Sequence, residues 1–136
     1  MVQLIYGPKG SGKTKRLIDM VNAEIEATTG DVVFIDDDKR YMYDVKRQIR
    51  FVDVTEYDVN SAERLYGFIC GILSQNFDIT AIYIDAFMHM IRKDAEEIED
   101  LFNNLKGIAD KHNIKLVINV SAKTDVVPEF LKDYII

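Results

Sequence analysis

The stretch Gly7-Pro8-Lys9-Gly10-Ser11-Gly12-Lys13-Thr14 decides the fold, because it fits the phosphate-binding pattern G-x-x-x-x-G-K-[ST] at every fixed position. The apolar run before it, residues 2–6, is typical of a short buried strand. The stretch after it, from Lys13 to about Ala27, has apolar residues at helical spacing, at Leu17, Val21 and Ile25. A strand, a glycine-rich loop and a helix, in this order, are the context in which the pattern binds phosphate.

The residue types in this stretch explain how it would hold a nucleotide. Its glycines let the backbone curl with the N–H groups pointing inward, and together with the helix N-terminus these groups form a site for the α- and β-phosphates. Lys13 can reach the β- and γ-phosphates, and the Thr14 hydroxyl can ligate Mg²⁺. We therefore predict a catalytic role for Lys13 and a cofactor-binding role for the whole loop: Gly7, Pro8, Lys9, Gly10, Ser11, Gly12, Lys13 and Thr14.

Length and composition predict one ordinary globular domain, spanning residues 1–136, in which 48% of the residues are hydrophobic. No run of eighteen apolar residues is present, so we expect no membrane span, and without a signal peptide the expected location is the cytoplasm. The single cysteine, Cys70, excludes a disulfide framework and a cysteine-based zinc site. The net charge of −6 argues against broad binding to nucleic acid.

The rest of the chain alternates between predicted strands and predicted helices. Apolar runs predict strands at residues 31–36, 50–54, 79–84 and 115–121, and helical spacing predicts helices at 60–75 and 94–112. This alternation predicts an α/β fold, a three-layer α/β/α sandwich around a mainly parallel sheet. Four local features are also expected: a short helix in 41–50, a loop in 87–93, Asn60 as a helix N-cap, and close packing of Gly67 and Gly71 against the sheet.

Carboxylates follow two of the predicted strands. Asp85 ends the run 79–84, and an apolar strand ending in Asp after a phosphate-binding loop predicts that Asp85, with Thr14, holds Mg²⁺. Asp36, Asp37 and Asp38 end the second strand. One of them would point at the phosphate site from the C-terminal edge of the sheet, or all three would form a solvated turn. The strand 115–121 ends in polar residues that could sense the γ-phosphate or orient water: Asn119, Ser121 and Lys123.

With these features in view, the chain resembles the RecA-like branch of the P-loop NTPases over nearly its whole length. The resemblance rests on the loop 7–14, on 81–85 as the magnesium strand and on 117–121 as a strand with a polar end. It implies that this last strand lies between the loop strand and the magnesium strand. A catalytic Glu often follows the second strand in that family, and the match with residues 34–38 assigns Asp38 the role of orienting the attacking water. A more distant resemblance is to the thymidine kinase core.

The expected function is therefore that of an ATP-binding protein with slow, Mg²⁺-dependent ATPase activity. No Asn-Lys-x-Asp motif for guanine is present, which favours ATP over GTP. Two alternatives stay open: a nucleotide-dependent switch or binding module without significant turnover, and a small-molecule kinase that uses the same site. The expected partner besides the nucleotide is a second copy of this chain or another protein. In a homo-oligomer, a neighbouring subunit could supply an additional cation to the site, for which Arg40, Arg92 and Lys123 are candidates.

Overall fold

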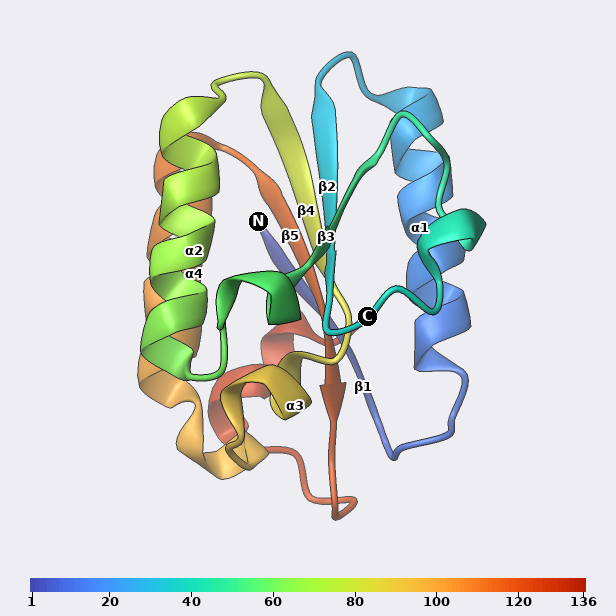
Figure 1. The fold of residues 1–136 in the computed structure, drawn as a ribbon. Coiled ribbons are helices and arrows are strands. Elements are labelled where there is room, and N and C mark those ends of the chain that lie inside the picture. The colour runs from blue at the N-terminus through green and yellow to red at the C-terminus, as the bar shows by residue number, and fades with distance from the viewer.

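In the computed structural model, which describes residues 1–136, five parallel strands form one sheet with helices on both faces (Figure 1). The α/β class and the parallel sheet predicted from the alternation are confirmed. The order across the sheet is β1-β5-β4-β2-β3, so that β5 lies between β1 and β4, as the resemblance implied. The strands are β1 (Val2–Gly7), β2 (Asp31–Asp36), β3 (Arg50–Asp53), β4 (Ile79–Ile84) and β5 (Lys115–Ser121).

The helices divide unevenly between the two faces of the sheet. Helix α1 lies on one face, while α2 and α4 lie side by side on the other, with the short α3 below them (Figure 1). Their bounds are α1 (Lys13–Ala27), α2 (Ala62–Gln75), α3 (Phe87–Ile91) and α4 (Glu99–His112). None of the helices combines the length and the apolar character that a membrane crossing needs.

Apolar alternation along the central strands explains the two covered faces. In β2, Val32 and Phe34 belong to the core under α1, whereas Val33 and Ile35 belong to the larger core under α2 and α4. Side chains alternate between the faces of a strand, so a sheet covered on both sides needs strands that are apolar throughout. All carboxyl ends of the parallel strands then meet at one edge, where the loop after β1 also lies.

Two predicted local structures are wrong. Residues 41–50 form no helix beyond a single 3₁₀ turn at Met42–Asp44. The Asn22 side chain on α1 replaces the missing helical hydrogen bonds: it donates to the Asp44 carbonyl oxygen and accepts from the Lys46 N–H, each at 2.9 Å. Residues 87–93, expected as a loop, instead begin with helix α3.

Helix α2 also differs from its predicted details. Its N-cap is Ser61 and not Asn60, because the Ser61 hydroxyl accepts the Arg64 N–H at 3.1 Å. Gly67 and Gly71 make no close approach to the sheet, since a Cβ built on either would meet no atom within 4 Å. Beside β1, Ile135 forms an isolated parallel bridge with Leu4.

Candidate functional site

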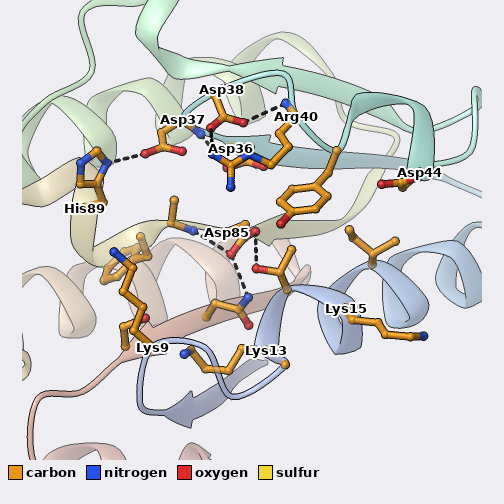
Figure 2. Close-up of a pocket in the computed structure, with 18 of the residues that line it drawn as sticks. Lys9, Lys13, Lys15, Asp36, Asp37, Asp38, Arg40, Asp44, Asp85 and His89 are labelled. Atoms are coloured by element: carbon orange, nitrogen blue, oxygen red, sulfur yellow. Dashed lines mark hydrogen bonds and ion pairs between the residues drawn. The ribbon is translucent and has the colours of Figure 1, made fainter.

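A cleft of about 1080 Å³ opens at the edge where the carboxyl ends of the strands meet. It lies between the loop after β1 and the turn after β2, with the ends of β4 and β5 at its base (Figure 2). Open parallel sheets bind their ligands at this edge. Most of the residues predicted from the sequence line the cleft: Lys9, Gly10, Gly12, Lys13, Thr14, Asp38 and Asp85. Gly7, Pro8 and Ser11 belong to the loop but do not line it.

The glycine-rich loop is curled in the way that its composition predicts. Gly10 and Gly12 adopt φ angles of 82° and 84°, a left-handed conformation that favours glycine. Gly12 immediately precedes α1, and no side chain caps this helix N-terminus. The Ser11 hydroxyl and the Lys13 amine both donate to the Pro8 carbonyl oxygen at 2.7 Å, so both side chains turn into the loop.

The Lys13 amine lies between opposing electrostatic influences. Burial lowers its pKa below the ordinary lysine value, and the negative charge of Asp85 partly opposes this effect. A phosphate would add further negative charge at the amine and favour its charged form. In the structure, the amine instead donates its hydrogen bond to the Pro8 carbonyl oxygen.

Asp85 is the most densely hydrogen-bonded carboxylate of the cleft. Its Oδ2 accepts the Thr14 hydroxyl at 3.0 Å, and its Oδ1 accepts the Asn119 side-chain N–H and the Ala86 backbone N–H, each at 2.9 Å. Its own N–H donates to the carbonyl oxygen of Ile35 on β2 at 2.9 Å. The residue is only 7% exposed. Donors from α1, from β5 and from its own turn therefore fix the carboxylate beside the loop.

Asp36 occupies the corresponding place at the end of β2 but has far fewer partners. It is 2% exposed and follows Val32 and Phe34 at alternate positions, which places it on the α1 side of the sheet. Its Oδ1 accepts the Asp37 N–H at 2.8 Å, and its Oδ2 has no hydrogen-bond partner. Burial raises the pKa of Asp36 to about 8, and the charges of the neighbouring Asp85, Asp37 and Asp38 add to this effect.

The two carboxylates after Asp36 each contact a neighbouring side chain. Asp37 Oδ2 pairs with Nδ1 of His89, which α3 brings to the cleft (Figure 2). Asp38 Oδ1 accepts the Arg40 N–H at 2.8 Å, and the Arg40 guanidinium lies 3.8 Å from its Oδ2. Asp38, which we predicted to orient water, thus lines the cleft beside Arg40, one of the three cations predicted to assist the site.

Not every residue predicted from the sequence has the predicted surroundings. Two of the candidate cations lie outside the cleft. Asn119 was predicted to sense the γ-phosphate or to orient water. In the structure it donates a hydrogen bond to Asp85, which depends on the adjacency of β5 and β4. Lys123 pairs with Asp94 at 3.1 Å, and neither it nor Arg92 lines the cleft. Comparison with protein-family models and with curated proteins gives no match to this chain.

Proposed function

We propose that this protein binds ATP and Mg²⁺ in the cleft and hydrolyses the nucleotide slowly, as a P-loop NTPase of the RecA-like type. The observation that carries the proposal is the 3.0 Å hydrogen bond from the Thr14 hydroxyl to Asp85 Oδ2, which joins residues 71 positions apart. A hydroxyl and a carboxylate at the base of a glycine-rich loop are the pair of oxygen ligands with which such NTPases hold Mg²⁺.

The residues of the loop fit a phosphate group. The left-handed glycines and the uncapped N-terminus of α1 offer backbone N–H groups to an anion. Lys13 would exchange its contact with the Pro8 carbonyl for the β- and γ-phosphates. When bound, Mg²⁺ would neutralise charge that develops on the transferred phosphoryl group. Thr14 and Asp85 would hold the ion, and Asn119 would keep the Asp85 carboxylate oriented.

Two features support slow turnover. The residue after Asp85 is Ala86, so the position at which many ATPases carry a catalytic Glu has no acid. The remaining candidate for orienting water is Asp38, whose Oδ1 accepts the Arg40 N–H. Stabilisation of a phosphoryl-transfer transition state depends on positioned charges, so a single partly engaged carboxylate supplies little of it.

A small-molecule kinase is the second candidate, because the cleft continues beyond the loop. It extends along α1 to Asp19, Asn22, Tyr41 and Asp44, where a second small molecule would have room. A nucleotide-dependent switch would use the same loop without turnover. The three functions differ in product and rate but share the binding chemistry of Lys13 and Thr14.

The proposal is tested by titrating the protein with ATP, GTP and a non-hydrolysable ATP analogue, with and without Mg²⁺, while released phosphate is measured. We expect Mg²⁺-dependent ATP binding and slow release. Lys13→Ala should weaken binding at least about 100-fold, because it removes the phosphate-binding cation. Lys111→Ala, at the far end of α4, is the matched control.

The magnesium pair is tested with two substitutions of Thr14. Thr14→Val removes the hydroxyl and should abolish most of the Mg²⁺ dependence of binding, whereas Thr14→Ser keeps the hydroxyl and should retain it. Asp38→Ala should lower phosphate release without changing affinity. Binding without release would favour the switch, and phosphate transfer to an added acceptor would favour the kinase. Absence of nucleotide binding would overturn the proposal.

A further inference from the structure

Three carboxylates converge at the end of β2. One side-chain oxygen of each of Asp36, Asp37 and Asp38 lies within 4.8 Å of the others. Figure 2 shows this group on the opposite side of the cleft from Lys9 and Lys13. The cations of the loop therefore do not neutralise it directly.

In each of the three carboxylates, one oxygen takes part in a hydrogen bond with the protein and the other does not. Asp36 Oδ1 accepts the Asp37 N–H, Asp37 Oδ2 contacts His89, and Asp38 Oδ1 accepts the Arg40 N–H. Asp36 Oδ2 and Asp37 Oδ1 have no such bond, and Asp38 Oδ2 has only the guanidinium at 3.8 Å. Each side chain is thus held through one oxygen, and no protein donor makes a hydrogen bond to its second oxygen.

Asp36 provides the independent indication that the ligand of this cluster is a cation. Its side chain is 2% exposed and lines the cleft, yet Oδ2 has no donor. A buried carboxylate oxygen without a donor is costly unless a proton or a cation meets it.

We propose that Asp36, Asp37 and Asp38 form a divalent-cation site that is separate from the Thr14–Asp85 pair and takes its ion without nucleotide. Carboxylate oxygens alone select a hard cation such as Mg²⁺, Mn²⁺ or Ca²⁺. Two oxygens on opposite sides of one such ion are about 4.1 to 5.1 Å apart, twice the metal–oxygen distance. The separations in the cluster are at most 4.8 Å, so one ion can contact all three oxygens with small side-chain adjustments.

The proposed cation site uses residues at the end of β2 and none of the glycine-rich loop. Thr14 and Asp85 are already joined to each other, and Asn119 and Ala86 occupy the second Asp85 oxygen. Asp85 contributes charge to the surroundings of Asp36, so an ion at the cluster would also relieve repulsion between the two strand ends. Binding of this ion consequently needs neither Thr14 nor Asp85, although Asp38 belongs both to this site and to the proposed ATPase machinery.

The test is a Mn²⁺ titration of the full chain without nucleotide, followed by electron paramagnetic resonance of free Mn²⁺. We expect one ion per chain, with a Kd on the order of 10⁻⁴ M for a three-carboxylate site. Asp37→Asn/Asp38→Asn, which changes the two more exposed ligands, should weaken binding at least about tenfold. Asp36→Asn should do the same, and its melting temperature shows whether it folds.

Two further variants separate this site from other acidic surfaces. Glu99→Gln/Asp100→Asn removes two adjacent exposed carboxylates at the start of α4 and should leave Mn²⁺ binding unchanged. Asp85→Asn should also bind Mn²⁺ in the absence of nucleotide. Absence of Mn²⁺ binding to the wild-type chain up to about tenfold above the expected Kd would overturn the proposal. Equal affinity of the Asp37→Asn/Asp38→Asn variant, or loss of the ion in Asp85→Asn, would overturn it as well.

Discussion

Asp85 and Asp36 end neighbouring parallel strands and are both buried, yet their surroundings are opposite. Asp85 accepts three hydrogen bonds, from Thr14, Asn119 and its own turn. Asp36 accepts one, from the residue that follows it, and its pKa is raised to about 8. The strands place the two carboxylates at the same edge.

The difference shows that a strand end supplies the position of an acid but not its environment. The donors to Asp85 come from the N-terminus of α1 and from β5, which flanks β4 on one side. The other neighbour of β2 is β3, which ends in Asp53, and the Asp53 carboxylate binds Thr55 and approaches Lys39. No donor from β3 therefore reaches Asp36, and its Oδ2 has no hydrogen-bond partner.

The largest expected effect is that of Asp85→Ala on stability. This substitution leaves the buried Asn119 amide and the partly buried Ala86 N–H without their acceptor and frees the Thr14 hydroxyl. We expect a loss of about 3 kcal/mol in the free energy of unfolding, measured by urea denaturation. Asp125→Ala, in an exposed loop, is the control. Equal stability of the two variants would mean that the hydrogen bonds of Asp85 contribute nothing net.

Asp36→Asn should change stability in the opposite direction. The folded pKa of about 8 lies above the ordinary value of 3.8, so the unfolded chain loses this proton first as the pH rises. The stability contributed by protonated Asp36 is complete below about pH 4 and is lost as the pH approaches 8.

Asn has the shape of Asp without its charge. The free energy of unfolding of Asp36→Asn, relative to that of the wild type, should therefore increase by on the order of 2 kcal/mol from pH 5 to pH 8.5. Urea denaturation at the two pH values, in EDTA to exclude divalent ions, measures this gain. Asp125→Asn is the matched control and should show no such trend. A wild type that is equally stable relative to Asp36→Asn at both pH values would contradict the raised pKa.

The smallest expected effect is that of His89→Ala. The His89 side chain is 83% exposed, although it contacts the better buried Asp37. Exposed ion pairs contribute little, so the free energy of unfolding should fall by less than about 0.5 kcal/mol. Thermal unfolding at pH 6 and pH 8 measures it. A loss comparable to that of Asp85→Ala would show that His89 fixes the whole turn after β2.

The sequence was most informative where the chemistry is local. The loop 7–14 and the helix after it follow from consecutive residues, and the bounds of β2 follow from one apolar run. The contacts that define the site are not local. Asn119 reaches Asp85 only because β5 lies beside β4, and the three carboxylates after β2 looked alike until the fold buried one of them.

The errors had equally specific causes. The segment 41–50 has helix-forming residues, but Asn22 binds its backbone from α1, and such a contact cannot be read from the segment itself. The glycines of α2 suggested close packing, yet they face open space. Local propensity was overridden in the first case and carried no packing information in the second.

The position of β5 has a consequence for the order in which this molecule can be assembled. Among the strands, β1 pairs only with β5, the last to be synthesised, and β5 alone connects it to β4. The Thr14–Asp85 contact therefore cannot be secured through the sheet until residues 115–121 are in place. A growing chain on the ribosome would carry the glycine-rich loop long before that loop could meet Asp85, and folding must bring these distant segments together late.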